Sequence, residues 1–145
     1  MEAPLTSRFI LTVAVLSAQG AERTIDAAEQ RALQSALSVS IAVVDTTGNL
    51  LAFRRMDGAP VASIAISVAQ ATSAVRSRVA SKLLQDRVDG GQPSLLAMPG
   101  VTALQGGVPI TVDGAVVGAI GVSGAQGPED VEVARAGAFS IQSIE

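Results

Sequence analysis

The sequence predicts an α+β fold in which an antiparallel sheet of about five strands carries packed helices, all within a single domain spanning residues 1–145. Two glycine-containing hairpins alternate with segments of helical periodicity, which is the pattern of hairpins connected through helices. The chain has 145 residues, of which 48% are hydrophobic and 16% charged. This length and composition suit one folded domain with a substantial core.

The first predicted elements are a strand followed by a helix. Phe9–Val15 is a run of β-branched and apolar residues, typical of a strand. Ser17 is a good helix N-cap, because its hydroxyl can accept a hydrogen bond from a first-turn N–H. Alanine and isoleucine then recur at helical spacing with charged residues between them. This predicts an amphipathic helix of about five turns.

A hairpin and a second helix follow. VSIAVVD (39–45) and NLLAFRR (49–55) flank a turn at 46–48 that contains Gly48. Pro60 suits the first turn of a helix that we expect to run to Arg78. Its apolar residues form a stripe, and no charge occurs between Gly58 and Val75. We therefore expect this helix to be buried on most sides. The stripe comprises Val61, Ile64, Ala65, Val68, Ala71 or Thr72, and Val75.

The C-terminal part begins with a short polar helix at Ser81–Val88 and a Gly/Pro-rich loop over 89–107. Loops of this length in compact domains are often functional. Asp113-Gly114 between two apolar runs, 108–112 and 115–122, is a strong hairpin signal. A last helix follows Pro128, with acidic residues in its first turn that suit the helix dipole.

Composition excludes several function classes. The chain has no Cys, His, Tyr or Trp. Disulfides, zinc-cysteine sites, Ser-His-Asp triads and Tyr or Trp stacking platforms for bases are therefore excluded. The net charge of −3 argues against nucleic-acid binding. The long uncharged stretches are broken by Pro, Gly, Ser and Thr, so none predicts a membrane span.

The N-terminus allows two interpretations. Phe9–Leu16 behind Arg8 has the outline of a secretion signal. The run is short, however, and only one basic residue precedes it beside Glu2. We expect a strand and a cytoplasmic protein, with secretion as the alternative.

Three charged residues are the candidates for catalysis. Arg54, Arg55 and Asp57 lie where a predicted strand ends. One arginine could hold a carboxylate while Asp57 acts as a base beside a carbonyl. The alternative is an exposed arginine and an aspartate that stabilises a turn.

Other candidate features each have a structural explanation. Gly106-Gly107 and Ser123-Gly124 could present backbone N–H groups to an anion, or could permit positive φ. The carboxylates Glu129, Asp130 and Glu132 are expected to be solvated. Met56 and Met98 are soft ligands that usually fill cores. No metal site is predicted.

The chain resembles the GlcG/HbpS-like family, described as haem-binding or haem-degrading, and also the C-terminal domain of PduO-type proteins. The resemblance rests on VSIAVVDTTGNLLAFRRMDGAP (39–60) and GGVPITVDGAVVGAIGVSGAQGPEDVEVARAG (106–137), and covers about Ser17 to Phe139. It implies a profilin-like fold, a homo-oligomer, and haem or another small ligand in an apolar groove. Family members commonly have an acidic residue near Ala65 and a basic one near Gln70, and both positions are uncharged here.

Haem is the cofactor that this resemblance implies. Its usual axial ligands are His, Cys, Tyr and Met, and only Met is available. The expected ligand-pocket residues are Met56, Ser63, Gln70, Met98, Gly106, Gly107 and Ser123.

Three functions remain open. The first is binding of a small apolar or carboxylate-bearing molecule, with haem as the ligand that the family suggests. The second is a cofactor-independent isomerase, cyclase or lyase acting in the same pocket. The third is a regulatory or structural homo-oligomer whose uncharged surfaces are interfaces.

Overall fold

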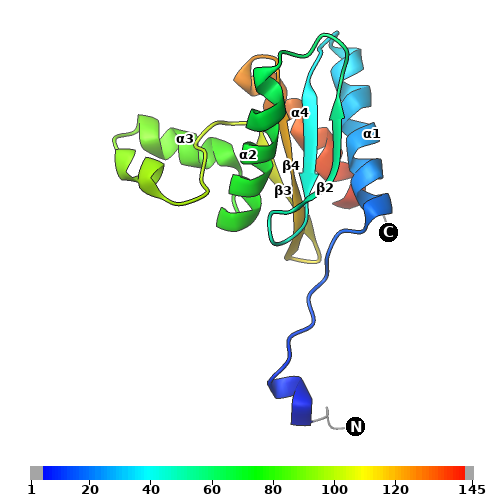
Figure 1. Ribbon diagram of the computed structural model, residues 1–145, viewed down its shortest axis with the longest axis vertical. Helices are drawn as coiled ribbons and strands as arrows, with labels where there is room; N and C mark the ends of the chain where they lie inside the picture. Colours follow the sequence, from blue (N-terminus) through cyan, green and yellow to red (C-terminus); the bar gives the residue numbers. More distant parts are fainter. Residues whose placement is uncertain (1–4, 143–145) are drawn as a thin grey trace.

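The computed structural model describes residues 5–142 and has a four-stranded antiparallel sheet with helices on both faces (Figure 1). The strands are β1 (Ser40–Val44), β2 (Leu50–Arg55), β3 (Gly107–Val112) and β4 (Ala115–Ser123), in the spatial order β2-β1-β4-β3. The helices are α1 (Ala18–Gln34), α2 (Ala62–Ser77), α3 (Ser81–Asp89) and α4 (Gly127–Gln142). Short 3₁₀ turns occur at Leu5–Arg8 (η1) and Pro93–Ala97 (η2).

Both predicted hairpins are confirmed. In the β1–β2 turn, Asp45 Oδ1 accepts hydrogen bonds from the backbone N–H groups of Thr47 and Asn49, at 2.9 and 3.0 Å. In the β3–β4 turn, Asp113 and Gly114 have φ of 50° and 80°. Two successive positive φ values give the turn the twist that hairpin strands need.

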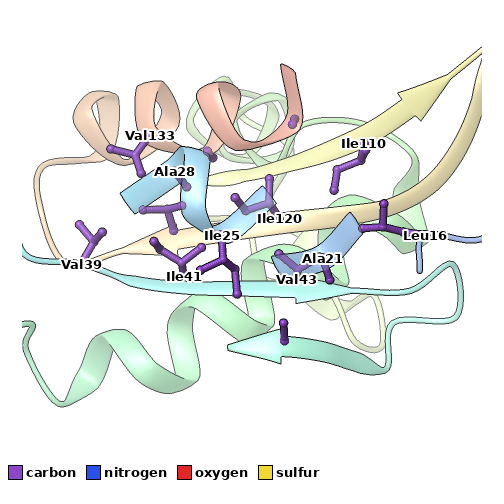
Figure 2. Close-up of a cluster of buried hydrophobic side chains, with 14 of the residues drawn as sticks. Leu16, Ala21, Ile25, Ala28, Val39, Ile41, Val43, Ile110, Ile120 and Val133 are labelled. Atoms are coloured by element: carbon purple, nitrogen blue, oxygen red, sulfur yellow. The ribbon is translucent and has the colours of Figure 1, made fainter. Parts of the chain in front are cut away.

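The first helix begins where its cap predicts. Ser17 Oγ accepts a hydrogen bond from Gly20 N–H at 3.0 Å. The alanine-rich face of α1 is buried, which lets the helix lie close to its neighbours. Together with α4 it covers one face of the sheet, and Figure 2 shows Ile25, Ile41, Ile120 and Val133 meeting in that core.

The predicted first strand is wrong. Phe9–Val15 is an extended arm that leaves the body of the molecule (Figure 1). No hydrogen bond joins its backbone to the described sheet, and contact with the sheet begins only at Leu16, whose N–H donates to Val117 O at 3.0 Å. A strand requires a neighbouring strand, and none of the strands described within residues 5–142 pairs with the arm. The sheet therefore has four strands rather than about five.

The second helix is buried on most sides, as expected, and Ala71 and Val75 of the predicted stripe are buried, but the rest of the stripe is not. Helix α2 packs on the other face of the sheet through small and polar residues, namely Ser63, Ser67, Gln70, Ala71, Ser73, Ala74 and Val75. Much of the predicted apolar stripe points away from the sheet, with Val61 and Ala65 exposed and Ile64 and Val68 half-buried. The reason is close packing. A Cβ on Gly121 would lie 1.9 Å from Ser67 O, so only a smooth helix face fits against this strand.

Candidate functional site

An apolar groove runs along the outer side of α2. It has a volume of about 610 Å³ and lies between the helix and the loop at 100–102. Its lining contains no charged residue and consists of Ile64, Ala65, Val68, Ala69, Thr72, Gly100, Val101 and Thr102. We call this the α2 groove. The outward-facing stripe of α2 forms its floor.

The loop wall of the groove is held in place by side chains. Thr102 N–H donates to Ser73 Oγ at 2.6 Å, which attaches the loop to α2. Ser73 Oγ itself donates to Ala69 O at 2.8 Å within the helix. The Ser73 hydroxyl therefore bonds to the backbone of its own helix and also positions the groove wall.

Arg76 lies at one end of the groove. A Cβ added to Gly100 would lie 1.7 Å from Arg76 Nη1, so the guanidinium lies directly over this glycine. Arg76 is exposed and has no ion-pair partner among residues 5–142. An unpaired guanidinium beside an apolar floor suits a ligand that carries a carboxylate.

A second, smaller cavity of about 270 Å³ lies where α2, α3, the end of β4 and the start of α4 meet. We call it the polar pocket. Its lining includes Ile66, Gln70, Leu104, Gln105, Ser123 and Asp130. Burial raises the pKa of Asp130 to about 6, against its ordinary value of 3.8, although an N–H bond from Ala125 lowers it in part.

The structure brings together the glycine and polar residues that the sequence singled out. Gln70 and Ser123 both line the polar pocket. Gly106 and Gly107 pack directly against Gln70, where any Cβ would collide with it. Gly107 N–H donates to Ser81 Oγ at 2.8 Å, so this amide already has a partner. Ser63 lines neither cavity and is buried elsewhere on α2, with its Oγ 2.8 Å from Ser40 Oγ.

The charged candidates at the end of β2 point in different directions. Arg54 contacts α1, with its Nη1 2.8 Å from Asp26 Oδ1 and 2.6 Å from Glu29 Oε2. The hydrogen bonds that its guanidinium donates to these two carboxylates raise the pKa of Arg54. Arg55 Nη2 donates to Ala59 O at 2.9 Å. Asp57 is exposed, and no ion pair joins it to either arginine in the described part of the chain.

The two methionine candidates also lie apart. Met56 packs against the core beneath α1 and α4. Met98 follows η2 and is 45% exposed, two positions before Gly100 of the groove wall. Neither belongs to the lining of the α2 groove.

The sequence did not predict that the apolar stripe of α2 lines a groove or that Asp130 lines the polar pocket. The stripe was not recognised as a groove floor because an apolar helix stripe normally predicts a buried face. Asp130 was grouped with the exposed acids Glu129 and Glu132, yet it is only 5% exposed. Its position relative to Val131 and Val133 could not reveal this, because the residue lies at the start of a helix where acids are common.

Haem and metal binding depend on which side chains lie near the groove. The residues between 5 and 142 contain no cluster of three or more His, Cys, Asp or Glu side chains arranged to hold a metal ion. The groove lining offers only the hydroxyls of Thr72 and Thr102, and Thr72 donates to Val68 O at 2.8 Å. This donor set does not fit tight axial ligation of haem iron.

None of the helices within residues 5–142 is long and apolar enough to cross a membrane.

Comparison with known proteins identifies the family. The family model described as "Haem degrading protein HbpS-like" matches residues 16–138. Protein GlcG of Escherichia coli K12 is 43% identical over 113 residues, covering 77% of this chain and 84% of GlcG. Among solved structures, HbpS superposes with a TM-score of 0.85 at 35% identity, covering 96% of this chain and 97% of HbpS. A haem complex of PduOC superposes with a TM-score of 0.79 at 26% identity, covering 88% of this chain and 95% of PduOC. With the family model spanning nearly all of the folded body, the chain belongs to the HbpS-like family.

Proposed function

We propose that this protein binds a small apolar molecule bearing a carboxylate, and that the molecule lies in the α2 groove. The observation that carries the proposal is the outward-facing apolar stripe of α2. A helix face that could have been buried on the sheet instead forms the floor of an open groove of about 610 Å³. An exposed apolar surface of this kind is typical of a binding site.

Arg76 supplies the polar contact in this proposal. Its guanidinium lies over Gly100 at the end of the groove and has two parallel N–H donors for a carboxylate. A ligand with an apolar body and one terminal carboxylate therefore matches both parts of the groove. Specificity would come from the single charged contact, and affinity from the apolar floor.

Haem shares part of this chemistry, since it has an apolar ring and two carboxylates. Relatives support it as a candidate, because a structure of PduOC is a haem complex and the family model is described as haem degrading. The absence of a strong iron ligand in the groove lining indicates that the porphyrin, rather than the iron, would provide the affinity.

A paired titration with haemin and iron-free protoporphyrin IX tests this proposal. We expect both to bind saturably and with similar affinity, because the groove recognises ring and carboxylate. Arg76→Gln should weaken both by about tenfold, as expected for a lost charge-assisted hydrogen bond. Ala65→Trp should block both, because Ala65 lies on the groove floor and is exposed.

The matched control is Ala62→Trp, which places the same bulk on an exposed position of α2 outside the groove lining. Binding of haemin alone, with a shifted Soret band, would contradict recognition through the porphyrin. Binding of neither compound would reject an amphipathic porphyrin-like ligand for this groove.

We infer a second role, self-association through the N-terminal arm. Phe9, Leu11 and Val13 are 80%, 88% and 67% exposed. Such high exposure is unusual for neighbouring large apolar side chains. A cleft of about 760 Å³ separates the arm at 12–14 from the β3–β4 hairpin at 114–116. The arm of a second copy would supply both the apolar cover and the missing strand partner.

Sedimentation of the full chain and of a chain lacking residues 1–15 tests the arm. We expect the full chain to form dimers or larger assemblies and the truncated chain to lose them while it keeps its secondary structure by circular dichroism. Leu16 is retained because it belongs to the core and pairs with β4. A full chain that sediments as a monomer would contradict this role.

A further inference from the structure

The polar pocket holds two amide oxygens that lack partners. Gln70 Oε1 and Gln105 Oε1 are buried, and neither accepts a hydrogen bond from the described residues. The orientation of the Gln70 amide is determined by its other end. Gln70 Nε2 donates to Gln105 O at 2.9 Å, and a carbonyl oxygen can only accept. The Oε1 of a side chain that is only 2% exposed is therefore left as an unpaired acceptor.

Such acceptors are rare in folded proteins because each one has lost its hydrogen bonds to water. The packing around the Gln105 amide nevertheless leaves space for it. A Cβ on Gly127 would lie 2.5 Å from Gln105 Nε2, so this glycine leaves space for the Gln105 side chain at the start of α4. In addition, Gln105 N–H is held by Gln85 Oε1 at 2.8 Å, which positions the loop from the α3 side.

Asp130 completes the set of acceptors. Its side chain lines the same pocket, and Oδ1 accepts the N–H of Ala125 at 3.0 Å. No lysine or arginine of residues 5–142 lies within ion-pair distance of it. When it is ionised, this buried carboxylate has no cation to balance it. Buried carboxylates are normally paired, so the pocket combines a negative charge with surplus acceptors.

We propose that the polar pocket binds a small organic cation with several N–H donors, of the guanidinium or primary ammonium class. A cavity of about 270 Å³ admits a molecule of this size. The cation would donate to Gln70 Oε1 and Gln105 Oε1 and would pair with the Asp130 carboxylate. This site is separate from the α2 groove, because it is lined by Ile66 and Gln70 rather than by Ile64 and Val68.

The proposal is tested by titrating the full chain with methylguanidinium chloride while backbone amides are followed by NMR. Tetramethylammonium chloride has a similar charge but no N–H donor, and serves as the control salt. We expect saturable shifts confined to the amides around Gln70, Gln105 and Asp130, with none from the control salt. Affinity should rise from pH 5 to pH 7.5, because the Asp130 carboxyl ionises within this interval.

Two variants separate binding from folding. Asp130→Asn retains an acceptor for Ala125 N–H, and should weaken methylguanidinium binding by about tenfold or more. Gln105→Met removes an acceptor that has no partner in the protein, so it should weaken binding without lowering stability. Glu132→Gln on the exposed side of α4 should leave binding unchanged.

Equal shifts from both salts, or no saturation in the wild-type chain, would overturn the proposal and leave ordered water as the occupant of the pocket. Unchanged binding in both Asp130→Asn and Gln105→Met would also overturn it. Ala65→Trp, which blocks the α2 groove, should not affect binding of the cation, so this test is independent of the function proposed for the groove.

Discussion

At the scale of single residues, burial distinguishes side chains that look alike in the sequence. Glu129, Asp130 and Glu132 form one acidic group near the start of α4, yet only Asp130 is buried. Removal from water penalises the ionised form of its carboxyl, which raises the pKa to about 6. A residue type that usually stabilises a helix start thereby becomes a titratable group in a cavity.

The free energy of unfolding should depend on Asp130 in a defined pH interval. The native carboxyl, with its pKa of about 6, binds a proton more tightly than the unfolded one, whose ordinary pKa is 3.8. Wild-type stability should therefore fall, by up to about 3 kcal/mol, as pH rises from about 4 to about 6. Urea unfolding of wild type and Asp130→Asn should show this fall only in the wild type.

Glu132→Gln is the control for this prediction, because it removes an exposed acid from the same helix. Its stability should follow the wild-type pH dependence. Parallel profiles for wild type and Asp130→Asn would show that Asp130 keeps an ordinary pKa in the folded protein.

At the scale of elements, α2 has a polar face against the sheet and an apolar face along the groove. Serine hydroxyls on α2 donate hydrogen bonds to backbone carbonyls of the same helix; Ser67 Oγ, for example, donates to Ile64 O at 2.9 Å. The helix can therefore bury a polar face against the sheet without unpaired donors. Because that smooth face approaches Gly121, the bulkier residues Ile64 and Val68 are directed into the groove.

Gly121→Ala tests this close approach. The new methyl would meet backbone atoms of α2, 1.9 Å from Ser67 O, and backbone cannot move aside as a flexible side chain can. We expect a loss of about 1–3 kcal/mol or more in the free energy of unfolding, measured in urea.

Gly20→Ala is the matched control. Its Cβ would meet side-chain atoms alone, 2.7 Å from Cδ1 at the flexible end of Leu16 and 3.4 Å from Ser17 Oγ, and alanine favours the helix. Its stability should stay unchanged or rise. Equal stability of Gly121→Ala and wild type would mean that α2 lies farther from β4 than the structure indicates.

At the scale of the whole molecule, the arm is an apolar segment that pairs with no strand of the sheet described within residues 5–142. The structure of HbpS superposes on 96% of this chain, which is more than residues 16–142 amount to. The matched span thus reaches into the arm.

Single cysteines introduced into the arm test whether two arms pair. The chain has no cysteine, so any disulfide must form between the introduced residues of two copies. In a symmetric dimer two copies of the arm would pair antiparallel about a twofold axis. Substituting residues 10–14 one at a time should then give a sharp maximum of cross-linking at the position nearest that axis, where paired Cβ atoms come within disulfide distance.

Leu33→Cys is the control for this scan, because Leu33 is 55% exposed on α1 and should cross-link only through random collisions. A flat profile along the arm, at the level of this control, would exclude antiparallel pairing of the arms.

Much of the fold could be predicted from local patterns. Helix caps and tight turns depend on neighbouring residues, so the cap at Ser17 and the turn at Asp113-Gly114 could be predicted locally, as could both hairpins. The family could also be recognised from the sequence, since its motifs lie largely within those hairpins. The functions of Arg54, Arg55 and Asp57 stay predictions, although the structure directs Arg54 toward α1 rather than toward Asp57.

The sequence by itself therefore determined the hairpins, the helices and the family, because each depends on short-range spacing. Only the tertiary structure decided which face of α2 is buried and which acid of α4 is removed from water. It also decided that Phe9–Val15 pairs with no strand in the described part of the chain. The physical reason is that burial and strand pairing depend on distant segments, such as Gly121 against Ser67. No local pattern contains those contacts.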